Sequence, residues 1–221
     1  MIAEELFLLL LDNASATPAL ERPRLERVLA AAALLDLAHS CHVRPATAGD
    51  PAPEGVLLTL DAPAPVHPAA VPALQLLRRR PLKAGAAIKK IGRPTEDRLI
   101  SHLESVQLIR RTPLSDRRFR NGFAYPLTDR RRPDAARLAL TGALFERRPP
   151  SPTIAAVITV LHAVDGLGAL LSLNDRGWRW VHARAVEISA GSWVDEAPSG
   201  LAEVNLAVTA ATVRQALATL G

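Results

Sequence analysis

The feature that most constrains the fold is a pair of segments that are apolar along nearly their whole length. Residues 2–11 read IAEELFLLLL, and residues 152–164 read PTIAAVITVLHAV. Their composition and spacing predict a helix in each segment, and a helix that is apolar all round must be buried on every side. Both are shorter than the ~20 apolar residues of a membrane-spanning helix. We therefore expect two buried helices, with 152–164 at the centre of the molecule.

Proline, glycine and polar clusters separate the other predicted elements. Apolar residues at helical spacing predict further helices at about 23–39, 69–79, 82–91, 95–106, 133–145, 178–188 and 201–220. Gly92 is expected to end the helix at 82–91, and Thr95 is expected to cap the one that follows.

The strand signals are few. Residues 56–60 predict one short strand, and 44–55 predict a loop. Leu108–Arg111 and Gly122–Leu127 predict a β-hairpin with an arginine-rich tip. The predicted fold class is therefore mainly α, and the length of 221 residues is compatible with one domain over 1–221.

Charge is distributed unevenly along the chain. The formal net charge is +5, but residues 78–148 hold 19 of the 27 basic and 7 of the 22 acidic residues, so that segment is +12 and the rest is −7. Such asymmetry indicates an anionic partner, either nucleic acid or a membrane surface. The alternative is that the arginines fall on loops, or that the middle and the ends pair with each other.

Composition also suggests a source and a compartment. Arginine outnumbers lysine 24 to 3, which is typical of a GC-rich bacterial genome. The acidic start of the chain does not look like a secretory signal. We expect a cytoplasmic protein that contacts a membrane only from its surface, on the inner face.

The sequence shows no catalytic or cofactor motif with good spacing. It contains no GxSxG, GxxxxGK[ST], GxGxxG or HExxH pattern. His39, Cys41 and His42 would point in different directions at a helix end, and His162 with Asp165 fits a structural pair. We expect no metal, no cofactor and no enzymatic activity, although an enzyme with an unrecognised site stays open.

A nucleic-acid-binding function is one alternative for the basic segment. A helix at 95–106 followed by a basic hairpin at 108–127 is typical of a winged-helix unit, in which the helix enters the major groove. However, that helix carries Glu96, Asp97 and Glu104 against Arg98 alone. Carboxylates that face phosphates are repelled.

Several stretches together resemble one known family. The opening Ile2–Asp12, the alanine- and leucine-rich Leu29–Ala38, the helix around Arg98–Leu108 with its hairpin, and Leu161–Asp165 (LHAVD) occur in that order. The chain is similar over nearly its whole length to the Golgi phosphoprotein 3 family. That resemblance implies a central hydrophobic helix bundle surrounded by amphipathic helices, with one β-hairpin.

The resemblance also implies a function. Members of the family are peripheral membrane proteins, and the eukaryotic ones bind the phosphatidylinositol 4-phosphate headgroup and tether glycosyltransferases. The family's headgroup pocket uses a Trp, an Arg and two further basic residues. The corresponding positions here are near Glu21 and at Ala30, Arg93 and Glu96, so Arg93 alone is retained.

We accordingly expect a non-enzymatic, anionic-lipid-binding adaptor, with a possible protein client and a possible homo-oligomer formed through the hairpin. Its headgroup contacts are expected at Lys89, Lys90, Arg93, Arg117, Arg118 and Arg120. Each Lys or Arg near an anionic bilayer contributes about 1 kcal/mol of binding free energy. A tip that carries arginines would contact headgroups rather than insert into the bilayer.

Overall fold

The computed structural model describes residues 1–114, 122–196 and 199–220. The α-helices of these parts are α1 (Ile2–Leu11), α2 (Arg22–His39), α3 (Val71–Arg79), α4 (Ala84–Ser105), α5 (Arg131–Phe145), α6 (Pro152–Ala163), α7 (Asp175–Ser189), α8 (Trp193–Glu196) and α9 (Leu201–Ala218). The short 3-10 helices are η1 (Pro68–Ala70) and η2 (Leu167–Ala169). The fold is mainly α, as the sequence predicts.

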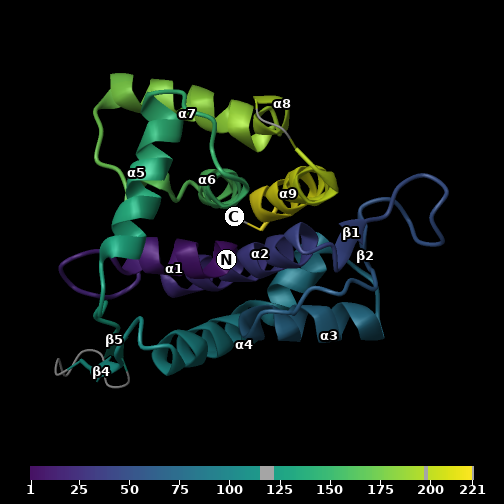
Figure 1. Cartoon of the computed structure of the whole chain (residues 1–221), viewed down its shortest axis with the longest axis horizontal. Helices are drawn as coiled ribbons and strands as arrows, with labels where there is room; N and C mark the ends of the chain where they lie inside the picture. Colours follow the sequence, from purple (N-terminus) through teal and green to yellow (C-terminus); the bar gives the residue numbers. More distant parts are fainter. Residues whose placement is uncertain (115–121, 197–198, 221) are drawn as a thin grey trace.

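The helices lie in layers (Figure 1). α3 and α4 form one outer layer, α1 and α2 lie against it, α6 and α9 come next, and α7 forms the opposite outer layer. α5 runs across these layers at one side and contacts α1, α6 and α7. The two outer layers are therefore separate faces of the molecule, with different helices exposed on each.

The core is centred on α1, α2 and α6. In α6 every residue from Ile154 to Leu161 is buried, which confirms the prediction of a central apolar helix. In α1 every residue except Glu5 is buried, including Glu4. The alanines at 30–33 of α2 are fully buried, and their small side chains let α4 and α9 pack closely on either side.

The region 82–105 differs from the prediction. A helix stopped by Gly92 and a second helix capped by Thr95 were expected, but α4 is one helix of 22 residues that passes through both positions. Gly92 serves close packing instead, because a Cβ there would lie 3.1 Å from Cβ of Glu26 on α2. Thr95 is buried inside the helix, and Pro94 is tolerated on the exposed side, where water can reach the carbonyl that it leaves unpaired.

The strands form two small antiparallel sheets. β1 (Val43–Pro45), β2 (Val56–Thr59) and β3 (Leu82–Lys83) make one, so part of the predicted loop 44–55 and the start of the predicted helix 82–91 are strand. β4 (Thr112–Pro113) and β5 (Phe123–Ala124) make the other. The second sheet confirms the hairpin, although its first paired strand begins after Arg111, and only a bridge from Ile109 to Leu127 precedes it.

Burial of α1 leads to a stability prediction. Leu8 is 1% exposed, whereas Leu138 on α5 is 66% exposed. Leu8→Ala should lower the free energy of unfolding by about 2–5 kcal/mol, because it removes buried methyl groups and leaves a cavity. Leu138→Ala, the same change at the surface, should alter it by no more than ~0.5 kcal/mol. Urea denaturation followed by circular dichroism measures both, and equal costs would contradict the packing of α1.

Candidate functional site

Three of the predicted contact residues lie on the exposed side of α4. Lys89, Lys90 and Arg93 are all exposed, within one turn of one another along the helix. Arg117, Arg118 and Arg120 lie outside the described residues. Exposed cations also occur where the sequence reasoning named no contact residue, at Arg78, Arg79, Arg80 and Lys83, which follow directly along α3 and into β3.

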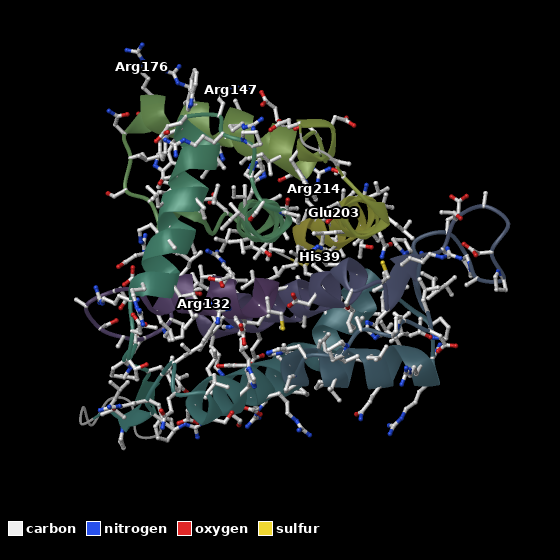
Figure 2. All side chains as sticks on the ribbon, viewed as in Figure 1. His39, Arg132, Arg147, Arg176, Glu203 and Arg214 are labelled. Atoms are coloured by element: carbon white, nitrogen blue, oxygen red, sulfur yellow. The ribbon has the colours of Figure 1, made fainter. Side chains whose placement is uncertain are left out.

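We call this set of seven exposed cations the cationic face. Its members are Arg78, Arg79, Arg80, Lys83, Lys89, Lys90 and Arg93. Within the described parts of the chain none of them forms an ion pair. They belong to neighbouring elements of one outer layer, and Figure 2 shows nitrogen-tipped side chains extending outward from it. No carboxylate of the described residues lies within ion-pair distance of these seven side chains, so their charge is free for an external anion.

Arg98 and Arg110 are also exposed and form no ion pair among the described residues, but the arginines of α5 and its flanks behave differently. Arg132 of α5 bonds Glu4 and Glu5 of α1, reaching across from one helix to the other (Figure 2). Arg130 and Arg137 both pair with Asp12, and Arg147 pairs with Glu187. The alternative that the basic middle pairs with the acidic ends is thus correct for Arg132 and Arg137 of α5 and for Arg130 and Arg147 beside it, but not for α3 and the first half of α4.

A cavity of about 500 Å³ opens at the middle of α4, bounded by the start of α2 and by the hairpin. Arg93 and Glu96 both line it, so two positions of the family's headgroup pocket meet here. Glu21 is exposed and immediately precedes Arg22, which also lines the cavity. Ala30 is fully buried in the core and does not line it.

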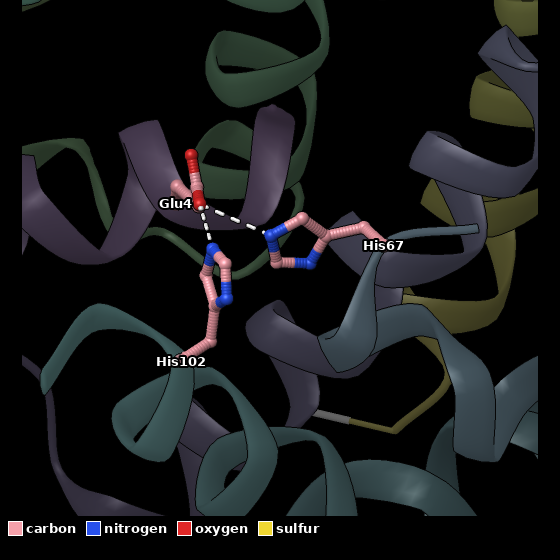
Figure 3. A group of neighbouring side chains, drawn as sticks. All are labelled: Glu4, His67 and His102. Carbon is pink, nitrogen blue, oxygen red and sulfur yellow. Dashed lines mark hydrogen bonds and ion pairs between the residues drawn. The ribbon is translucent and has the colours of Figure 1, made fainter. Parts of the chain in front are cut away.

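A second cluster joins three segments that are far apart in the sequence (Figure 3). Glu4 Oε1 lies 3.0 Å from Nε2 of His67 and 3.1 Å from Nε2 of His102. The two imidazole rings meet edge-on, 4.4 Å between centroids. His67 belongs to the loop before η1 and His102 to α4, so no spacing in the sequence could have indicated this cluster.

The Glu4 cluster has the ligand atoms of a metal site, but its hydrogen bonds favour a structural role for Glu4. Nδ1 of His67 accepts a hydrogen bond from the backbone N–H of Ala69, which places the imidazole proton of neutral His67 on Nε2. His67 therefore donates to Glu4, and a metal ion at Nε2 would have to displace that proton and break the Ala69 bond. Arg132 adds a further positive charge at the other oxygen of Glu4.

Electrostatics fit a structural carboxylate. Burial alone would raise the pKa of Glu4, but hydrogen bonds from His67 and Arg132 outweigh it and lower the pKa to about 2. The neighbouring Asp36 of α2 accepts the backbone N–H groups of Ile2 and Ala3 at 2.8 and 3.0 Å. Burial nevertheless raises the pKa of Asp36 to about 6. Together the two carboxylates hold the first turn of α1 in place.

The residues around His39 are satisfied without a ligand. His39 of α2 faces Glu203 of α9 at 3.9 Å (Figure 2), and Ser40 Oγ lies 2.9 Å from Nδ1 of the buried His42. A metal site needs several histidine, cysteine or carboxylate side chains that point to one place. Among the described residues, the Glu4 cluster has that arrangement.

Comparison with known proteins identifies the family. A family model described as Golgi phosphoprotein 3 (GPP34) matches residues 2–203. The chain belongs to this family. The matched region runs from α1 to the first turn of α9, and a search of curated proteins gives no match. Within the described residues, no helix combines the length and apolarity that a membrane crossing requires.

The Glu4 cluster generates a pH prediction. The pKa of Glu4 is lowered from 4.5 to about 2, so its ionised form stabilises the fold above pH 4.5, and this contribution is lost as the pH falls toward 2. Glu4→Gln should cost roughly 2–4 kcal/mol of unfolding free energy at neutral pH, because Arg132 and both histidines lose a charged partner. The cost should shrink as the pH falls from about 4.5 to about 2.

Urea denaturation across this pH range measures the effect. Glu54→Gln is the matched control, because Glu54 is exposed, and it should change the unfolding free energy by less than ~0.5 kcal/mol at every pH. A Glu4→Gln cost that is independent of pH would contradict the assignment.

Proposed function

We propose that this protein is a non-enzymatic peripheral membrane adaptor that binds anionic lipid headgroups through its cationic face. The observation that carries the proposal is the set of seven exposed cations on α3, β3 and α4 with no ion pair among the described residues. Membership of the Golgi phosphoprotein 3 family, whose members are generally non-catalytic adaptors, supports the same function. The cytoplasmic side of a bacterial inner membrane is the surface that this charge suits.

The energetics are sufficient for reversible binding. Each cation near an anionic bilayer contributes about 1 kcal/mol, and the attraction falls off within a Debye length of ~10 Å at 0.1 M salt. Contact by four or five of the seven residues then gives about 4–5 kcal/mol, which is a millimolar-range affinity. A second attachment, either a specific headgroup or a copy joined through the hairpin, would be needed for stable residence.

Specific binding of phosphatidylinositol 4-phosphate is the family's finer property, and the cavity beside Arg93 argues against transferring it unchanged. Glu96 stands in the cavity at a family position that is otherwise basic, and Asp97 lies beside it. Two carboxylates oppose a phosphate monoester dianion. Arg93 is the one basic position of the family's site that remains for a lipid phosphate, and Lys89 and Lys90 of the neighbouring turn, which lie outside the cavity, compensate in part for the lost ones.

The winged-helix alternative has less support. Its recognition helix at 95–106 is the second half of the continuous helix α4, which packs on α2 and whose buried residues in this half include Leu99. The exposed positions of that half include Asp97, and Glu104 is engaged by Arg111 at 3.3 Å. Six of the seven residues of the cationic face lie on α3, β3 and the first two turns of α4, and Arg93 alone adjoins the predicted recognition helix.

Vesicle co-sedimentation tests the proposal. Wild-type protein should bind vesicles of phosphatidylcholine mixed with phosphatidylglycerol, and it should bind pure phosphatidylcholine vesicles far less. Lys89→Gln/Lys90→Gln should weaken binding to the anionic vesicles by about 10–30-fold, because two contacts of ~1 kcal/mol each are removed. Raising the salt concentration should weaken wild-type binding in the same direction.

A matched double variant controls for net charge. Arg176 and Arg179 of α7 are exposed, form no ion pair within the described residues, and lie on the opposite outer layer, where Figure 2 labels Arg176. Arg176→Gln/Arg179→Gln lowers the net charge equally, yet it should change binding by less than ~3-fold. Equal losses from the two variants, or equal wild-type recovery on neutral and anionic vesicles, would overturn the proposal.

A further inference from the structure

One side of α9 is exposed, and it is apolar in the first half of the helix. Leu201 is 79% exposed, and Val204 and Val208 are about half exposed. Their spacing of three and four residues puts the three side chains in one row along the helix. Contiguous exposed apolar residues mark interaction surfaces, whereas scattered ones do not. Polar but uncharged residues continue the row to the end of the helix: Thr212, Gln215 and Thr219.

The row carries no charged side chain. Glu203 and Arg214 are the charged residues of α9, and they lie about 200° and 220° around the helix from Leu201. On that side Glu203 faces His39 of α2 (Figure 2). The outer layers differ, because α3 and α4 carry the cationic face and α7 presents two exposed arginines. A two-fold axis brings identical patches together, so two copies of this chain would repel each other at the outer layers but not at the row on α9.

A groove lies beside the second half of the row. It has a volume of about 610 Å³ and is lined by the end of α9, the start of α4 and the loop before β2. The two helices approach closely there, since a Cβ on Gly85 would lie 3.7 Å from Cβ of Ala216. Small residues such as these and Ala86 leave room for a larger apolar side chain from outside. The charged residues that also line the groove are Glu54, Lys83 and Lys89.

The positions of the exposed leucine and of the groove match a two-fold arrangement. Leu201 precedes Val208 by about two helical turns, and Ala216, which lines the groove, follows Val208 by about two turns. If two α9 helices pack antiparallel about an axis near Val208, Leu201 of each copy lies opposite the groove of the other. The two grooves are then ~24 Å apart, so their lysines do not face each other.

We propose that the exposed row of α9 is a homodimer interface, in which Leu201 of each copy enters the groove between α4 and α9 of the other. A row of 18 helical residues is ~27 Å long and ~10 Å wide, so with the groove each copy would bury roughly 400–500 Å². A total of about 800–1,000 Å² is typical of weak, reversible complexes. The interface does not involve the hairpin, and it is independent of the proposed lipid binding.

Sedimentation equilibrium of the full chain tests this interface. The weight-average mass of the wild type should rise from 23.7 kDa toward twice that value between about 10 and 500 µM protein. Leu201→Asp should weaken association at least about tenfold, because it places a charge against the small apolar residues of the groove. An acidic residue in the first turn of α9 suits the helix dipole, so this variant should fold. Leu138→Asp, the same change at an exposed leucine of α5, should leave association unchanged.

A cysteine at position 208 tests where the axis lies. On a Cys41→Ser background, Val208→Cys should form an intermolecular disulfide under mild oxidation, because the antiparallel pair brings the two positions face to face. Leu138→Cys on the same background is the matched control, and it should form far less of the crosslinked dimer.

A mixture of two variants tests whether the contact is reciprocal. Ala86→Arg places a bulky charge in the groove and should weaken self-association as Leu201→Asp does. In a mixed pair, Leu201 of the first chain meets the intact groove of the second, and the introduced carboxylate and guanidinium meet at the other groove. The mixture should therefore associate at least about tenfold more tightly than either variant alone. Thermal denaturation verifies that each variant is folded.

Several results would overturn the interface. These are a wild-type mass of 23.7 kDa at every concentration, association that folded Leu201→Asp leaves unchanged, no disulfide at position 208, or no gain in the mixture. Loss of vesicle binding by a monomeric Leu201→Asp protein would assign the row to the membrane instead. In the other cases vesicle binding that depends on Lys89 would leave the proposed function standing.

Discussion

The rest of the structure depends on the complete burial of α1. The first turn of any helix leaves backbone N–H groups without partners, and α1 also buries the carboxylate of Glu4. Because water does not reach these groups freely, the protein itself must supply their hydrogen-bond partners. Asp36 accepts the N–H groups of Ile2 and Ala3. Glu4 is held by His67, His102 and Arg132. The polar contacts of one helix thereby fix the loop before η1 and the positions of α2, α4 and α5.

This requirement also explains how the basic residues are divided. The arginines of α5 neutralise the acidic groups of α1 and of the loop after it, so they serve the fold. α3 and the first half of α4 lie on the far side of the α1–α2 layer and meet no such acidic groups. Their seven cations remain free for an external anion. The net charge of +5 therefore hides two groups of basic residues: one is paired with acidic residues inside the protein, and the other forms the exposed cationic face.

Most of the fold could be predicted from local signals, because apolar periodicity indicates helices directly. The family could also be predicted, since its stretches occur in order. Failures arose where tertiary packing decides: Gly92 looks like a helix stop but provides a close approach to Glu26. The Glu4 cluster joins residues up to 98 positions apart, so only the fold brings it together. Lys89, Lys90 and Arg93 could be named from sequence, whereas the unpaired state of Arg78–Lys83 required the structure.

The most direct test of the account asks which outer layer touches the membrane. Spin labels are placed on a Cys41→Ser background at Ala86, an exposed residue of α4, and at Ala183, an exposed residue of α7. Electron paramagnetic resonance then follows each label as vesicles containing phosphatidylglycerol are added. We expect the label at Ala86 to become immobilised and shielded from a water-soluble relaxation agent, and the label at Ala183 to stay unchanged. Shielding at Ala183 alone, or at neither position under conditions where the protein sediments with the vesicles, would contradict it.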